Sequence, residues 1–143
     1  GPFLLMRFVR GNMPRLLFLC GLAGLVWSGL YLFAAASPTL WIAAALIGIA
    51  HLGGGAQWMM SNYGLQTVTP DYIRGRVLAG DMGFATLVMG ISSIGAGVLG
   101  EIFPIRIAIA LIAVICGLAS TAYLFGTIGM RKRLRSEMLQ QPT

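Results

Sequence analysis

Five residues between positions 51 and 66 could together hold a small molecule, four of them through their side chains. His51 has an imidazole and Trp58 an amphipathic ring, and two side-chain amides follow at 62 and 66, while the surrounding residues are mostly apolar. On a helix of about 100° per residue these groups fall within about 80° of one another. A polar stripe on a membrane helix is costly unless it faces protein or a water-filled cavity. We therefore predict a substrate-cavity stripe made of His51, Gly55, Trp58, Asn62 and Gln66. For His51 alone, packing inside the protein explains the residue as well as a ligand or proton contact does.

The charged segment TPDYIRGRV, residues 69–77, holds the second group of candidate residues. Thr69 is suited to be an N-cap and Pro70 to be the first residue of a helix, so we expect a helix to start here. Arg74 and Arg76 would then reach the lipid headgroups or acidic partners. We predict a cytoplasmic gate made of Pro70, Asp71, Arg74, Gly75, Arg76 and Asp81.

Asp81 lies about a turn and a half beyond Arg76, just inside an apolar segment. It could pair with an arginine from a neighbouring loop, or it could titrate as part of a proton path. We favour the pairing, because at this shallow depth the side chain can still reach the interface.

The glycine triplet Gly53–Gly55 lies near the middle of the polar helix. Each glycine in a helix interior costs about 1 kcal/mol relative to alanine. Either the triplet permits close contact with another helix, or it permits a bend or partial unwinding beside a substrate. Both interpretations remain open from the sequence.

The composition shows which elements must position these residues. Of 143 residues, 57% are hydrophobic and 10% are charged, whereas a soluble domain has about 25% charged residues. A membrane-spanning helix needs about 20 mostly apolar residues. The sequence therefore predicts an all-α membrane protein with four transmembrane helices, at about residues 16–36, 40–66, 70–100 and 105–128.

The four predicted spans differ in their side chains. The first and last are almost entirely apolar, so we expect them to be able to face lipid. Small residues in the third recur every three or four positions, which gives one stripe where another helix can approach closely. The stripe consists of Ala79, Gly83, Thr86, Gly90, Ser93, Gly97 and Gly100. It indicates helix packing, or alternatively a sliding surface used in conformational change.

The basic residues predict the orientation of the spans. Four crossings would place nine of the ten on one side of the membrane and leave only Arg106 on the other. Basic loops are cytoplasmic, so both ends of the chain are predicted to be cytoplasmic. The nine are Arg7, Arg10, Arg15, Arg74, Arg76, Arg131, Lys132, Arg133 and Arg135. We interpret RKRLR after the last span as a membrane-surface anchor and expect no nucleic-acid partner.

Few residues offer catalytic or metal-binding chemistry. The chain has one histidine, and it has no HExxH motif and no paired-carboxylate or Ser/His arrangement, so we expect neither an enzyme nor a metal or cofactor site. Cys20 and Cys116 both fall inside apolar spans, where a packing role is expected.

The junction LQTVTPDYIRGRVLAG resembles a segment of a known transporter family. The residues that carry the resemblance are Gln66, Pro70, Asp71, Arg74, Gly75, Arg76 and Val77. They are similar to the junction between helices ten and eleven in one branch of the major facilitator superfamily, which contains the transmembrane secretion effectors and the enterobactin-exporter-like efflux proteins. One departure is that RFVRGNMPRLL, in the place of the basic loop before helix nine, has no acidic residue.

This resemblance implies a C-terminal part of a twelve-helix transporter. Residues 1–15 would be the end of helix eight and a cytoplasmic loop, and residues 131–143 a cytoplasmic tail. The implied function is proton-coupled efflux of hydrophobic or amphipathic small molecules, of drug or siderophore type, by alternating access in the bacterial inner membrane. Its partners would be the lipid bilayer, the substrate and the remaining transporter helices. A non-transporting membrane scaffold or assembly subunit is the alternative, because it would explain the small-residue stripe equally well.

Overall fold

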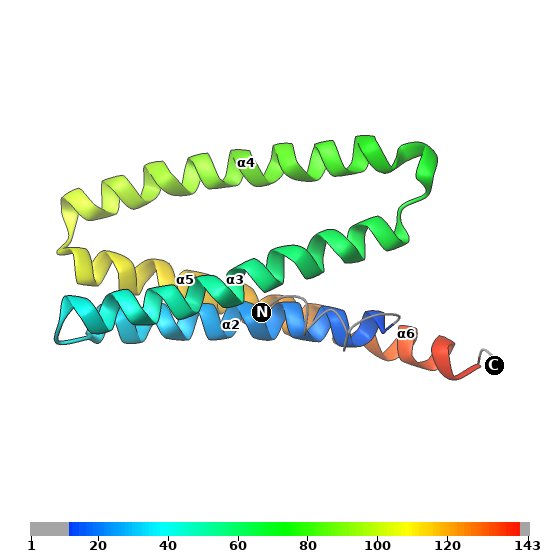
Figure 1. Cartoon of the computed structure of the whole chain (residues 1–143), viewed down its shortest axis with the longest axis horizontal. Coiled ribbons are helices and arrows are strands. Elements are labelled where there is room, and N and C mark those ends of the chain that lie inside the picture. Colours follow the sequence, from blue (N-terminus) through cyan, green and yellow to red (C-terminus); the bar gives the residue numbers. More distant parts are fainter. Residues whose placement is uncertain (1–11, 141–143) are drawn as a thin grey trace.

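The computed structural model describes residues 12–140, which form five helices (Figure 1). They are α2 (Met13–Ala36), α3 (Leu40–Val68), α4 (Asp71–Ile102), α5 (Ile105–Gly126) and α6 (Ile128–Gln140). Four helices are long and apolar enough to cross a membrane, the fourth being α5 together with most of α6. This confirms the prediction of an all-α chain with four apolar helices of membrane-spanning length. The predicted helix end within residues 1–11, and residues 141–143 of the tail, lie outside the described residues.

The helices begin and end at polar and proline residues. The Asn12 side chain accepts a hydrogen bond from the Arg15 N–H at 3.1 Å, at the start of α2. The prediction that Thr69 caps α4 is wrong: its hydroxyl instead donates to the Leu65 carbonyl at 2.6 Å and so ends α3. Pro70 takes the N-cap position of α4, in an extended conformation with φ −57° and ψ 145°. This conformation separates the two helices, because it cannot continue either of them.

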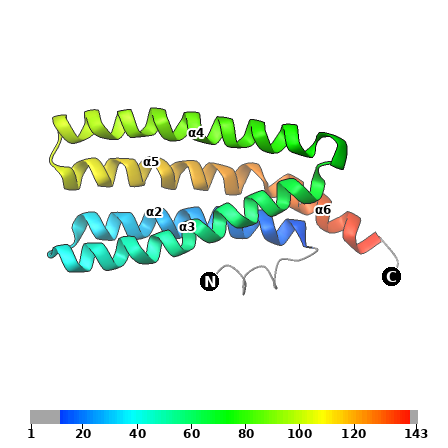
Figure 2. The same ribbon diagram turned by 45° about the horizontal axis from the view of Figure 1, so that its top comes forward.

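α2 is the central helix of the group (Figure 2). It packs against α3 on one side and against α5 on the other, and α6 also contacts it. α4 is placed differently, since it contacts only α3 and α5 among the described helices and buries none of its residues. Among the described helices, the first span is therefore the most closely packed one, and the small-residue stripe of the third span buries no residue. Gly21, Gly24 and Ser28 are buried, so the same small-residue spacing exists on α2, where it is used.

Small residues bring α2 and α5 into close contact. The Ser28 hydroxyl, which is buried, donates to the Ala113 carbonyl at 2.6 Å. A Cβ atom added to Gly117 would lie 2.7 Å from the Ser28 Oγ. Gly24 faces the Ser120 side chain in the same way. The absence of side chains at these glycines therefore makes the interhelical hydrogen bond possible.

The contact between α2 and α3 is made by larger side chains. Met60 is 2% exposed and packs with Leu16 and Cys20. α3 remains helical through the glycine triplet. A Cβ atom at Gly54 would lie 3.4 Å from the Trp27 ring, which is ordinary contact. A Cβ atom at Gly53 or Gly55 would meet no described atom within 4 Å beyond its own helix backbone and chain neighbours. The unbroken helix therefore shows no unwinding, while the choice between close contact and a bend stays open.

Replacing Ser28 with alanine should reduce stability by a small amount. The substitution removes the hydroxyl that joins α2 to α5, and such bonds between membrane helices contribute about 0.6 kcal/mol on average and up to about 1.7 kcal/mol. Unfolding in mixed micelles, followed by circular dichroism, would measure the loss. Ser93→Ala is the matched control, because the Ser93 hydroxyl bonds to Met89 of its own helix at 2.8 Å. Equal effects of the two substitutions would show that the interhelical bond adds nothing.

Seven of the eight basic residues in the described part of the chain gather at one end of the molecule. The start of α2, the junction between α3 and α4, and α6 all lie at this end (Figure 1). The opposite end has the two turns at residues 37–39 and 103–104, followed by Arg106 at the start of α5. Arg7 and Arg10 lie outside the described residues. The tail predicted for residues 131–143 is helical as far as Gln140.

Candidate functional site

A cavity of about 650 Å³ lies between the described helices, and all five of them contribute to its lining. Six of the lining residues have side chains that can form hydrogen bonds. They are Cys20, Gln57, Ser61, Asp81, Ser120 and Tyr123. Most of the other lining residues are leucine, methionine, valine, alanine or glycine. Asp81 is the one charged residue in this lining, so the cavity is apolar with a few hydrogen-bonding groups and a single carboxylate.

The α3 side of this cavity is formed by residues at helical spacing. Gln57, Ser61 and Gly64 are four and three positions apart and therefore share one face. The same face carries the contact with α2, because Gly64 is buried beside Leu16. Sequence reasoning placed Gln57 outside the polar stripe and gave no role to Ser61. The sequence did contain a signal for this face. Gln57 and Ser61 lie at helical spacing from Gly64, a small residue suited to packing against another helix.

The predicted substrate stripe lies on a different face of α3. Its centre is roughly 130° away from the face of Gln57 and Ser61. The lining of the 650 Å³ cavity, as formed by the described residues, contains none of its five members. Gly55, Trp58 and Gln66 are exposed on the chain. Because α3 is one continuous helix, helical spacing still places the five on one face, and their role as a substrate stripe stays a prediction.

Two side chains of the stripe contact backbone carbonyl groups of α3 itself. The His51 Nδ1 lies 2.9 Å from the Ile47 carbonyl oxygen, and the Asn62 amide donates to the Trp58 carbonyl at 3.1 Å. The His51 ring also lies beside Tyr31, with 6.1 Å between ring centroids. His51 is nevertheless exposed, so both interpretations of this residue stay open. The side-chain carbonyl oxygen of Asn62 remains available for other contacts.

The residues predicted to form the gate lie together at the junction between α3 and α4. Arg74 Nη2 is 2.6 Å from the Asp71 Oδ1 and donates to the Thr69 carbonyl at 3.2 Å. The pair lies within one helix and is 41% and 87% exposed for the arginine and the aspartate, so it contributes at most about 1 kcal/mol. Pro70, Gly75 and Arg76 are exposed. The pair thus holds the junction itself, and closure of a path by these residues stays a prediction.

Asp81 is the one predicted site residue that lines the cavity. Within residues 12–140 the ion pairs are Arg74 with Asp71 and Arg133 with Glu137. Asp81 therefore makes no ion pair with the described residues, and the predicted pairing with an arginine is not seen among them. Asp81 is exposed on the chain and borders the space shared by the helices.

The described part of the chain has no group of three or more His, Cys, Asp or Glu residues that could hold a metal ion. Cys20 and Cys116 are free thiols in α2 and α5. Cys20 is buried against Met60 and also borders the cavity.

No protein-family model, curated protein or solved structure matches this chain. The resemblance of the junction to major facilitator transporters therefore depends on its own residues.

Proposed function

We propose that the chain forms one flank of a transport path for amphipathic small molecules across a membrane. The observation that carries this proposal is the cavity of about 650 Å³ between helices of membrane-spanning length. Small-molecule sites commonly have volumes of about 300–1,000 Å³ and are apolar with a few placed polar groups. A cavity of this kind between membrane helices suits a molecule that carries both apolar and polar parts.

The chemistry of the lining favours a lipophilic cation as substrate. The carboxylate of Asp81 would attract a positive charge, and the Gln57 amide and Ser120 hydroxyl would supply hydrogen bonds. The apolar walls would accept rings or alkyl chains. A carboxylate at this place could also carry a proton, which would couple transport to a proton gradient. Efflux by alternating access is the form of transport that we propose, in agreement with the family that the junction resembles.

The exposed α4 supports the presence of further helices in the working protein. A Cβ atom added at Gly83, Gly90 or Gly97 would meet no described atom within 4 Å, apart from the neighbouring residues and the backbone of α4 itself. In a bilayer these small residues are suited to close helix contact. We propose that the remaining helices of a major facilitator transporter cover this face. In that arrangement the end with the basic residues is cytoplasmic, and the membrane is the bacterial inner membrane.

Filling the cavity should slow transport. Ser61→Phe adds a ring at a position that lines the cavity, and we expect the efflux of a fluorescent lipophilic cation to fall about fivefold, which corresponds to about 1 kcal/mol. Cells that express the whole protein would be loaded with the dye and energised, and the rate of dye loss would be measured. Ser92→Phe is the control, because Ser92 is equally exposed but does not line the cavity.

Two results would contradict this path. Equal rates for both phenylalanine variants and the parent protein would show that the cavity is not part of it. If Asn62→Leu changed the range of transported substrates while Ser61→Phe kept the parent rate, the path would run along the polar stripe and not through the cavity. If the protein is a scaffold, dye efflux should be the same in the parent protein, in every variant and in cells that lack the protein.

A further inference from the structure

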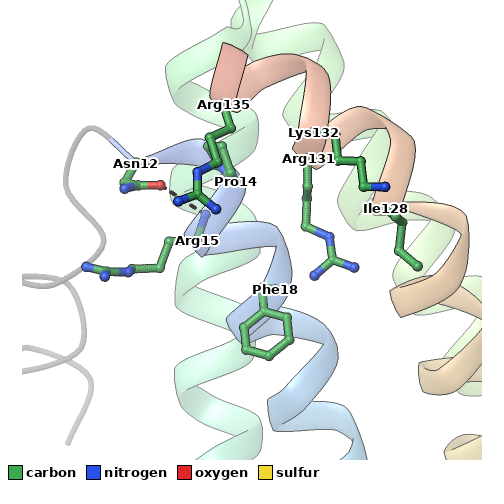
Figure 3. Close-up of a pocket in the computed structure, with 8 residues that line it drawn as sticks. All are labelled: Asn12, Pro14, Arg15, Phe18, Ile128, Arg131, Lys132 and Arg135. Carbon is green, nitrogen blue, oxygen red and sulfur yellow. Dashed lines mark hydrogen bonds between the residues drawn. The ribbon is translucent and has the colours of Figure 1, made fainter. Parts of the chain in front are cut away.

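A second cavity, of about 640 Å³, lies where α6 meets the start of α2 (Figure 3). Four of its lining residues are cations: Arg15, Arg131, Lys132 and Arg135. Phe18 and Ile128 supply its apolar part. This cavity thus combines a concentrated positive charge with an apolar surface, at the end of the molecule that carries most of the basic residues.

None of the four acidic residues of the chain lines this cavity. Asp71 and Glu137 form ion pairs with arginines that do not line it. Asp81 borders the other cavity, and Glu101 lies near the far end of α4. No acidic side chain in the lining therefore neutralises the cations, and the cavity carries a net positive charge that would attract an anion.

Arg131 is held in place before any ligand binds. Its Nη2 donates to the Leu124 carbonyl at 2.6 Å and its Nε donates to the Thr127 carbonyl at 3.3 Å. Its guanidinium carbon lies 5.4 Å from the centre of the Phe18 ring. These contacts fix the arginine between α2 and the end of α5, which lowers the ordering cost of binding an anion.

Arg135 follows one helical turn later and extends toward the start of α2, beside Asn12 and Pro14 (Figure 3). Like charges four residues apart on a helix repel each other, and an anion between Arg131 and Arg135 would remove that repulsion. Arg15 and Lys132 extend on the two outer sides (Figure 3), so they could add contacts to a larger group.

We propose that this cavity binds the phosphate group of an anionic phospholipid. Guanidinium groups match phosphate oxygens in geometry and charge. The cations stand at the start of one apolar helix and just after another, which is the level of the lipid headgroups. Phe18 and Ile128 continue the site with apolar surface, where an acyl chain can lie. Basic pockets between membrane helices bind such headgroups. The proposal does not depend on the transport function.

Binding would be tested with the whole chain in lipid nanodiscs or mild detergent micelles. Phosphatidylglycerol is titrated against phosphatidylcholine, and bound lipid is counted by native mass spectrometry. We expect phosphatidylglycerol to be preferred, and Arg135→Gln to weaken it about fivefold, which corresponds to the roughly 1 kcal/mol expected for one cation near a membrane surface. Arg15→Gln should act in the same direction. Arg131 is left unchanged, because it also holds α5 carbonyl groups.

Arg133→Gln is the matched control, since Arg133 is on the same helix and does not line the cavity. It should leave the affinity within about twofold of the parent protein. An equal loss in Arg133→Gln and Arg135→Gln would overturn the site, because general surface charge would then explain the preference. Inorganic phosphate is the second ligand. If millimolar phosphate displaced the lipid as strongly as added phosphatidylglycerol does, a free phosphate compound would be the occupant and the lipid proposal would fail. Arg135→Lys should keep most of the affinity, and a full loss in this variant together with unchanged helicity would also contradict a charge-based site.

Discussion

Replacing Gly117 with leucine is expected to lower the free energy of unfolding by about 3 kcal/mol. A Cβ atom at this position would already lie 2.7 Å from the Ser28 Oγ, and leucine adds three further carbons. Ser28 cannot move aside without cost, because it is buried and bonded to the Ala113 carbonyl. Overpacking and the lost interhelical bond should therefore add, and α2 should separate from α5.

The loss would be measured by unfolding in mixed micelles, with helicity as the signal. Gly48→Leu is the matched control, because a Cβ atom there meets no described atom within 4 Å beyond its own helix backbone and chain neighbours. It should change stability by less than about 0.5 kcal/mol. The double substitution Gly117→Ala with Ser28→Gly should keep much of the parent stability, because the smaller residue of the contact then lies on α2 and no longer on α5. Equal losses at Gly117 and Gly48 would contradict a close contact between α2 and α5.

The number and limits of the four long apolar spans could be predicted from the sequence because they depend on local properties. Apolar runs of membrane length set the helices, and Pro38, Pro70 and Pro104 mark the breaks between them. The sequence did not show which of the two helices Thr69 belongs to at the second break, because both Thr69 and Pro70 are suited to start a helix. Only the structure shows that Thr69 completes α3 instead, because its backbone N–H and its hydroxyl both donate to the Leu65 carbonyl.

Which helices pack together could not be predicted in the same way. Small residues at helical spacing occur on α4 and also on α2, at Gly21, Gly24 and Ser28. Spacing shows that a close approach is possible, but it does not show which partner makes the approach. The face of α3 that lines the cavity could not be predicted either. The stripe from His51 to Gln66 was identified by its number of polar groups, whereas the cavity uses Gln57 and Ser61 on another face. The choice between two faces depends on the neighbouring helices, which lie far away in the sequence.

Replacing Asp81 with asparagine is expected to reduce the transport of lipophilic cations about thirtyfold, while a neutral substrate of similar size should change less than about threefold. The substitution keeps the shape of the side chain and removes the one charge in the cavity lining. A charge-assisted contact of this kind contributes about 2 kcal/mol, which corresponds to the thirtyfold change. Dye efflux from energised cells would give both rates.

Two further variants separate the charge of Asp81 from its place in the helix. Asp81→Glu keeps a carboxylate and should retain at least about a third of the cation rate, provided that the longer side chain fits the cavity. Asp71→Asn removes a carboxylate on the same helix whose partner is Arg74 and which does not line the cavity, and it should leave the preference for cations unchanged. If Asp81→Asn lowered the rates of cationic and neutral substrates equally, the carboxylate would not act by attracting the substrate. A proton-coupling role would then be supported if counterflow, which needs no net proton movement, remained intact while energised efflux was lost.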